Sequence, residues 1–262
     1  MMKRDKYLLV KGAAGLGNRI LFLLSALLYA RLCNRIVIVD WCDSNYSDDG
    51  SNTFSRLFCS ASCHPLSELP GSDCMRPDIW RGNLDNSVHD MLLCHQTEKM
   101  PPFHCLHLLT VDMRSLDYEE DILVACGFFE RIRDFRKHLQ GTADKLRAMP
   151  TQKILRLLIR EHLSLHPSIQ NQLDEFRSSK FKQEMVGVHV RYTDKRANLS
   201  VTHRALKRLL RRNPELTVFL STDNASVQQQ FESLYANVIT TPKWFPTNEA
   251  NMHNNTDCPD RV

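Results

Sequence analysis

The side chains best suited to chemistry come at the end of one short apolar run, Met185–Val190. His189 lies within this run, Arg191 follows it directly, and a Thr-Asp-Lys triplet occupies residues 193–195. Because side chains alternate along a strand, His189 and Arg191 would lie on the same face. A guanidinium can bind a diphosphate through two parallel hydrogen bonds. This spacing predicts a site for an anionic ligand such as a nucleotide diphosphate, and therefore a nucleotide-using enzyme.

The place of these side chains in the chain supports that interpretation. The apolar run predicts a buried strand, and open α/β sheets bind ligands at the carboxyl ends of parallel strands. A second polar group, Ser-Thr-Asp-Asn at residues 221–224, follows the apolar run Leu216–Leu220 and would lie at the same sheet edge. Two plainer alternatives stay open: His189 is a core histidine, and residues 221–224 cap a helix.

A second candidate site is a glycine-rich turn between an apolar run at residues 7–10 and an apolar helix, Leu16–Cys33; its glycines are Gly12, Gly15 and Gly17. Backbone N–H groups at a helix N-terminus attract phosphate. The turn is not a P-loop, because no Gly-Lys-Ser/Thr follows, and its spacing departs from the dinucleotide fingerprint. Asp40, at the end of a predicted strand, could hold a ribose and keeps an NAD interpretation open. A turn that uses glycine for backbone reasons alone is equally compatible.

These residues need elements to position them, and the sequence predicts two α/β units. In the first, strands at residues 7–10 and 35–40 flank the helix Leu16–Cys33, which favours a right-handed parallel unit. In the second, three strands alternate with two helices: Met185–Val190, Thr202–Arg212, Leu216–Leu220, Ala225–Tyr235 and Val238–Thr240. For residues 42–120 the sequence predicts short helices and loops. A strand at residues 122–129 and helices at residues 134–148 and 154–165 are predicted to follow. Three strands are few for a doubly wound sheet, so we expect an incomplete second domain.

Composition narrows the class of protein. The chain is 42% hydrophobic and 24% charged with a net charge of +4, as is ordinary for a globular protein. The start of the sequence lacks the pattern of a secretory signal, and the nine cysteines are an odd number. We therefore expect free thiols in a reducing cytoplasm. The longest uncharged apolar stretch, residues 20–30, is shorter than the roughly 20 residues that span a bilayer, so no membrane span is expected.

Other classes of function have little support. Residues 181–213 carry nine Lys or Arg and two Asp or Glu, but no interleaved aromatic residues for base stacking, so nucleic-acid binding is not expected. Cys59, Cys63 and His64 lack the fourth ligand of a structural zinc site, and no metal is expected. The serine-hydrolase and zinc-protease motifs are absent from the sequence.

The motifs together resemble the NodZ-like and α-1,6-fucosyltransferase family. The resemblance covers most of residues 7–60 and 185–246. It is carried by Gly15-Leu-Gly-Asn-Arg19, Val39-Asp-Trp41, Asp49-Gly-Ser-Asn52, His189-Val-Arg191, Thr193-Asp-Lys195, the segment Val218–Asp223 and the segment Val238–Phe245.

The resemblance implies an α/β fold of GT-B type, with two Rossmann-like domains facing a cleft. An acceptor-side domain would span residues 1–180, and a nucleotide-sugar-binding domain, incomplete, residues 181–262. The implied activity is inverting, metal-independent transfer of L-fucose from GDP-fucose to an oligosaccharide hydroxyl, with no cofactor. Arg191 would neutralise the β-phosphate of the departing GDP, and His189 would help to hold the nucleotide. The remaining implied donor-binding residues are Thr222 and Asp223 on one side of the cleft and Gly15, Gly17 and Asn18 on the other.

Two residue departures from the family pattern, and one missing segment, leave other functions open. Tyr192 stands where the α-1,6-enzymes carry a second arginine, and Leu199 stands where they place the glutamate that is their presumed base. Asp194 is then the nearest carboxylate that could act as the catalytic base. The family's last segment, which completes the nucleotide pocket, has no counterpart before Val262. A non-catalytic nucleotide-sugar-binding relative is the first alternative, and an NAD-dependent oxidoreductase that uses Asp40 is the second.

Overall fold

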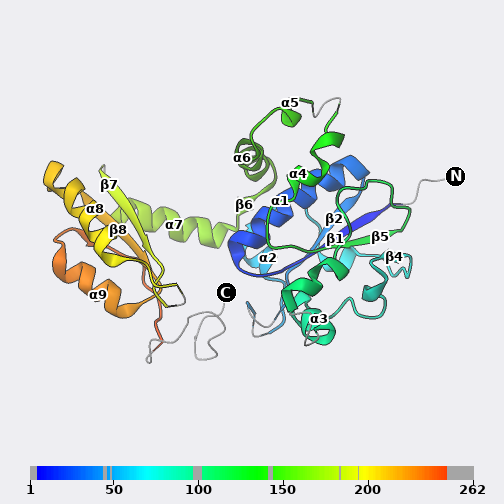
Figure 1. Cartoon of the computed structure of the whole chain (residues 1–262), viewed down its shortest axis with the longest axis horizontal. Coiled ribbons are helices and arrows are strands. Elements are labelled where there is room, and N and C mark those ends of the chain that lie inside the picture. Colours follow the sequence, from blue (N-terminus) through cyan, green and yellow to red (C-terminus); the bar gives the residue numbers. More distant parts are fainter. Residues whose placement is uncertain are drawn as a thin grey trace. The chain divides into compact units, whose positions relative to one another are not determined.

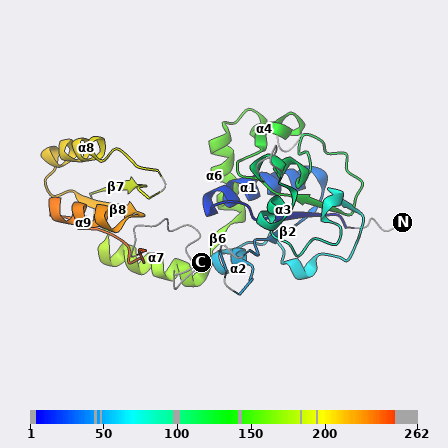
Figure 2. The ribbon, with the colours of Figure 1, turned by 60° about the horizontal axis from the view of Figure 1, so that its bottom comes forward.

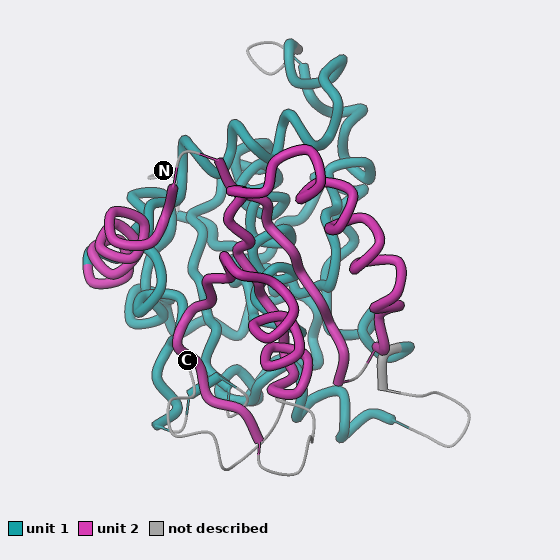
Figure 3. Tube along the Cα trace, turned by 90° about the vertical axis from the view of Figure 1, so that its left-hand side faces the viewer, with its two compact units in different colours: residues 1–167 teal, residues 168–262 magenta. Residues whose placement is uncertain are grey.

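The chain forms two compact units, residues 1–167 and 168–262 (Figure 3). The computed structural model describes residues 5–43, 46–47, 49–96, 102–140, 144–182, 184–193 and 195–246. The division falls earlier than residue 180, because helix α7 (Pro167–Lys180) belongs with the second unit. The ring of Phe176 in this helix lies 5.9 Å from that of Phe219 in the second sheet. The sequence did not indicate α7, which has no buried residue.

The first unit is built on a four-stranded parallel sheet with strand order β2-β1-β5-β4 (Figure 1). Its strands are β1 (Tyr7–Lys11), β2 (Ile36–Asp40), β4 (Met75–Arg76) and β5 (Ile122–Ala125). Helix α1 (Leu16–Cys33) connects β1 to β2, and its bounds match the sequence prediction. The predicted parallel β–α–β opening is confirmed.

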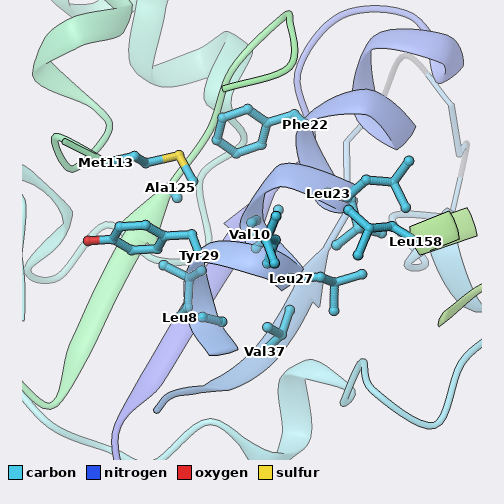
Figure 4. Close-up of a cluster of buried hydrophobic side chains, with 14 of the residues drawn as sticks. Leu8, Val10, Phe22, Leu23, Leu27, Tyr29, Val37, Met113, Ala125 and Leu158 are labelled. Atoms are coloured by element: carbon cyan, nitrogen blue, oxygen red, sulfur yellow. The ribbon is translucent and has the colours of Figure 1, made fainter. Parts of the chain in front are cut away.

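Both faces of this sheet are covered, as strands buried on both sides require. Leu8 and Val10 face α1, and Figure 4 shows Leu23 and Leu27 of that helix beside Val10 and Val37. Leu9 points to the opposite face, where it packs with the residues that α3 (Val88–His95) buries. The sheet therefore holds the carboxyl ends of β1 and β2 in a fixed position.

The other elements within residues 42–120 are short, as predicted, and α6 is the longest of those that follow in the first unit: it spans residues 151–162, where the sequence predicted a helix at 154–165. The remaining elements of the first unit are α2 (Thr53–Leu57), β3 (Phe58–Cys59), η1 (Leu66–Glu68), η2 (Asp78–Trp80), η3 (Pro102–Leu108), α4 (Ile132–Phe135), η4 (Arg136–His138), α5 (Asp144–Arg147), α6 (Thr151–His162) and β6 (Ser164–Leu165). The prediction of one helix over residues 134–148 is wrong: α4, η4 and α5 share this stretch. The sequence has Gly and Thr at 141–142, both poor helix formers.

The second unit has a three-stranded parallel sheet of β7 (Met185–Val190), β8 (Thr217–Thr222) and β9 (Val238–Ile239). Helices α8 (Leu199–Arg212) and α9 (Ala225–Leu234) alternate with the strands, as predicted, and can be followed in Figure 2. Helix α8 begins earlier than predicted, because the side chain of Asn198, not Thr202, caps it by accepting the Val201 N–H at 3.3 Å. Asn224 caps α9 in the same way, as predicted. That this domain is incomplete stays a prediction.

Strand β7 is not the buried strand that its apolar sequence predicts. Gly187 and His189 are exposed, whereas Val190 is buried against α8 and α9. In the described part of the chain, the helices α8 and α9 cover one face of this sheet. The other face contacts α7 through Phe219 and Phe176, and Gly187 and His189 remain exposed. A run of apolar residues does not specify such packing partners.

Helix α1 is the one helix in the described residues that is long and apolar enough to cross a membrane, with a mean hydropathy of 1.4. Its residues 22–30 are all buried in the first unit. This burial is the environment of a core helix. That no segment spans a membrane stays a prediction. The eight described cysteines are free thiols, and the reducing compartment that they suggest stays a prediction.

Candidate functional site

The carboxyl end of β7 presents the predicted cation. Arg191 follows the last strand residue, and its side chain is exposed. His189 is also exposed and lies opposite Ser221 of β8 in the strand register. Val190 points to the other face, into the core of the unit. The structure therefore places an imidazole and a guanidinium at one end of an open sheet, where an anion could reach both.

Asp223 lies at the end of the neighbouring strand and binds the segment that follows Arg191. Its Oδ1 accepts the Tyr192 N–H at 2.6 Å. Its Oδ2 accepts the Thr193 N–H at 3.2 Å and the Thr193 hydroxyl at 2.6 Å. The resemblance assigned Asp223 to the donor. The structure shows that the chain itself uses both oxygens of this carboxylate.

These hydrogen bonds also fix the charge of Asp223. Partial burial works to raise the pKa of the carboxyl group. The hydrogen bonds from Thr193 and from the backbone of Tyr192 outweigh it, so that the net effect lowers the pKa. Asp223 is thus a carboxylate at neutral pH and a poor proton acceptor.

Thr222 and Asp194 complete the predicted residues of the second unit. Thr222 is 5% exposed, and its hydroxyl accepts the Asn224 N–H at 3.3 Å. Its side chain therefore supports the turn into α9, and it is not presented to solvent in this structure. Asp194, the predicted base, lies outside the described residues.

The predicted glycines of the first unit lie at the N-terminus of α1. Gly15 is the N-cap and has no side chain to cap the helix, and its carbonyl accepts the Asn18 N–H at 2.9 Å. Gly17 is exposed in the first turn, and a Cβ there would have no neighbour within 4 Å. Neither packing nor backbone geometry therefore requires glycine at this position, and that Gly17 lies against the donor stays a prediction.

Gly12 has a different role from Gly17. A Cβ on Gly12 would lie 2.5 Å from Nη1 of Arg19, so its lack of a side chain makes room for this buried guanidinium. The residue of the turn with a positive φ is Ala14, at 57°, and not a glycine. Arg19 was part of the predicted motif, but nothing in the sequence indicated that it packs inside the turn.

The surroundings of Asp40 argue against the ribose-binding role that the NAD interpretation gave it. The carboxylate is 3% exposed and forms an ion pair with Lys11, which faces it across β1 and β2. Lys11 also donates to the Leu84 carbonyl at 2.7 Å. A ribose hydroxyl would have to displace a buried cation to reach Asp40. The oxidoreductase alternative therefore loses the residue on which it depended.

Three cavities of about 300, 280 and 430 Å³ in the first unit lie away from the predicted site residues. They are lined by residues at the amino ends of the strands, such as Tyr7, Ile36 and Asp121. Ligands of open α/β sheets bind at the opposite, carboxyl ends. The described residues contain no group of three or more His, Cys, Asp or Glu that could hold a metal ion.

Two Rossmann-like units, each with polar side chains at the ends of its parallel strands, are the architecture of the GT-B fold. Residues 3–92 match the family model of the xyloglucan fucosyltransferases. The NodZ α-1,6-fucosyltransferase co-crystallized with GDP is 22% identical, with a TM-score of 0.63 over 92% of this chain and 79% of that chain. The Bradyrhizobium fucosyltransferase NodZ is 20% identical, with a TM-score of 0.61 over 92% and 80%.

A third solved structure, an Arabidopsis thaliana FUT1 mutant in complex with GDP, is 16% identical, with a TM-score of 0.53 over 90% of this chain and 59% of that chain. No curated protein sequence matches the chain. These findings confirm the predicted resemblance and the GT-B fold. The solved structures therefore establish the fold, and the family match over residues 3–92 is a resemblance confined to the first unit.

Proposed function

We propose that this protein transfers L-fucose from GDP-fucose to a hydroxyl group of an oligosaccharide. The observation that carries the proposal is the exposed Arg191 at the carboxyl end of β7, next to a turn that Asp223 holds. The family match over residues 3–92 supports fucose as the sugar. The NodZ structures with GDP and GDP-fucose support the nucleotide.

In the proposed reaction, the bond between the sugar C1 and the β-phosphate oxygen breaks, and its electron pair stays on GDP. The acceptor oxygen forms the new bond to C1 and gives its proton to a base. Arg191 stabilises the negative charge that develops on the β-phosphate, which is the usual contribution of a fixed cation to such a transition state. Because this cation supplies positive charge to the leaving group, we propose that transfer needs no metal.

The finer features of the reaction are part of the proposal. Transfer to a 6-hydroxyl is supported by the similarity to NodZ, an α-1,6-fucosyltransferase. Inversion follows if the acceptor attacks from the face opposite the leaving GDP. We keep Asp194 as the base, since the hydrogen bonds and lowered pKa of Asp223 make the latter unsuitable. His189 would assist by contacting the nucleotide.

The test is a transfer assay with the purified chain, GDP-fucose, and chitin and xyloglucan oligosaccharides as acceptors. We expect a product one deoxyhexose heavier by mass spectrometry, in equal yield with and without EDTA. The linkage and anomeric configuration follow from the NMR spectrum of the product. Calorimetry should show binding of GDP and none of NAD. Failure of the chain to bind GDP would contradict the proposal.

The non-catalytic alternative is favoured by one observation. Leu199 occupies the position at which the resembling enzymes carry glutamate; it begins α8 and packs against the core of the second unit. A leucine there cannot accept a proton. Binding of GDP without transfer to any acceptor would establish this second function.

A further inference from the structure

We propose that Asp223 is a positioning residue, which acts on the donor through Arg191 and makes no contact with the donor itself. The inference rests on the proposed function, since it concerns the same phosphate site. It differs from the role that the family resemblance implies for Asp223, which is to line the donor cleft.

The strand register places the two residues at matching positions. Val190 of β7 pairs with Thr222 of β8 in a parallel arrangement. Arg191 and Asp223 are therefore the first residues beyond the paired ends of two neighbouring strands. From this position the carboxylate reaches the two residues that follow Arg191, Tyr192 and Thr193, in three hydrogen bonds of 2.6 to 3.2 Å.

Three sets of contacts fix the backbone around Arg191. The strand pairing of Val190 fixes the residue before it. Asp223 fixes the two residues after it. The carbonyl of Arg191 accepts the Ala197 N–H at 3.1 Å, which closes the loop between β7 and α8. The backbone from which the guanidinium projects thus has a defined direction.

A fixed direction matters for a phosphate-binding arginine. A cation stabilises developing charge most when its donors are already aimed at it and need not reorganise. The same arrangement accounts for Tyr192, which stands where related enzymes have a second arginine. Tyr192 contributes its backbone N–H to Asp223, and any residue type except proline could do so.

Direct binding of the donor by Asp223 is less compatible with the structure. A carboxylate has about four lone-pair sites, and three donors already use this one. Its negative charge would also repel the diphosphate. The bound hydrogen-bond donors and the negative charge both favour a role in which Asp223 acts on Arg191 through the backbone of residues 192–193.

The test compares the affinity for GDP of five forms by calorimetry: wild type, Thr193→Val, Thr193→Ser, Arg191→Ala, and Thr193→Val combined with Arg191→Ala. Loss of the Thr193 hydroxyl should weaken GDP binding about tenfold, which equals about 1.4 kcal/mol. Serine keeps the hydroxyl and should restore the wild-type affinity to within about twofold. Added to Arg191→Ala, the valine change should have almost no further effect, because the two residues act as one unit.

Amide exchange gives a readout that does not depend on GDP. In Asp223→Asn, the amides of Tyr192 and Thr193 should exchange faster than in wild type, and by a larger factor than the amides in the middle of β8. Unchanged exchange would overturn the inference, and so would a full additional loss of affinity from Thr193→Val in the Arg191→Ala background. Absence of GDP binding in the wild type would instead overturn the proposed function, and the two failures are thus distinguishable.

Discussion

The guanidinium of Arg19 and the carboxylate of Asp43 form an ion pair of 2.6 Å, with side chains only 3% and 4% exposed. The Nε of Arg19 also donates to the Ala14 carbonyl at 2.9 Å. The ring of Tyr46 lies 4.1 Å from the guanidinium carbon. Arg19 therefore ties the turn before α1 to the segment after β2, and it holds Ala14 in a left-handed conformation that costs about 1 kcal/mol.

The first prediction concerns this ion pair. Arg19→Met should lower the free energy of unfolding by about 3 kcal/mol, because it removes the cation that balances a buried carboxylate. Urea unfolding followed by circular dichroism measures the loss. The matched control is Arg114→Met, which breaks an exposed pair with Asp112 and should change stability little. Equal effects of the two changes would show that the buried pair does not hold the turn.

A second prediction separates packing from ligand binding at Gly17. Gly17→Ala should leave the stability unchanged or raise it by about 0.5 kcal/mol, because a Cβ meets no atom within 4 Å and alanine favours helix. The methyl group should nevertheless weaken GDP binding by blocking close approach to the helix N-terminus. Calorimetry measures the affinity. Gly71→Ala, also in open space, is the control and should bind GDP like wild type. Normal affinity of Gly17→Ala would remove Gly17 from the site.

The elements that the sequence predicted correctly have strong local signals. Leu16–Cys33 is a long apolar stretch without proline, and β7 is a β-branched run that ends in charged residues. Helix α7 has no such signal. Its sequence is polar, and its ring contact with the sheet through Phe176 depends on a residue far along the chain. Tertiary contact decides such an element, and local pattern does not.

The candidate site likewise has features that the local sequence predicts and features that depend on tertiary contact. Strand ends alone predicted that the segments of Arg191 and Asp223 would be neighbours, and the parallel pairing confirms it. That Asp223 would use its oxygens on Tyr192 and Thr193 depends on the register of that pairing, which composition does not fix. The ion pair of Lys11 and Asp40 is likewise a consequence of register, since the two residues face each other across the strands.

A third prediction concerns pH. The ring of His203 stacks on Phe231 at 4.6 Å, and its Nδ1 lies 2.7 Å from the Tyr235 hydroxyl. Burial lowers the pKa of His203, and the positive charge of Lys207 lowers it further. The unfolded chain, in which a histidine has a pKa of about 6.5, therefore takes up the proton first as the pH falls. The stability that neutral His203 contributes is present above this pH and is lost as the pH falls below it.

Thermal unfolding from about pH 7.5 to about pH 5.5 tests this sign. Wild type should lose more stability over this range than His203→Gln, which carries no titrating group at the position. His89→Gln, at an exposed site on α3, is the control and should keep the wild-type slope. A slope unchanged by His203→Gln would show that His203 is equally protonated in the folded and unfolded chain.

The last prediction concerns Arg191. Arg191→Ala should reduce the rate of fucose transfer at least about 100-fold, because the β-phosphate of the leaving GDP loses its cation. The side chain is exposed, so the thermal unfolding midpoint should hardly move. Arg191→Lys keeps the charge but not the two-pronged geometry and should give an intermediate rate. Arg204→Ala removes an exposed cation from α8 and should leave the rate unchanged. If transfer continues at the wild-type rate after Arg191→Ala, the charge that stabilises the departing nucleotide comes from elsewhere in the chain.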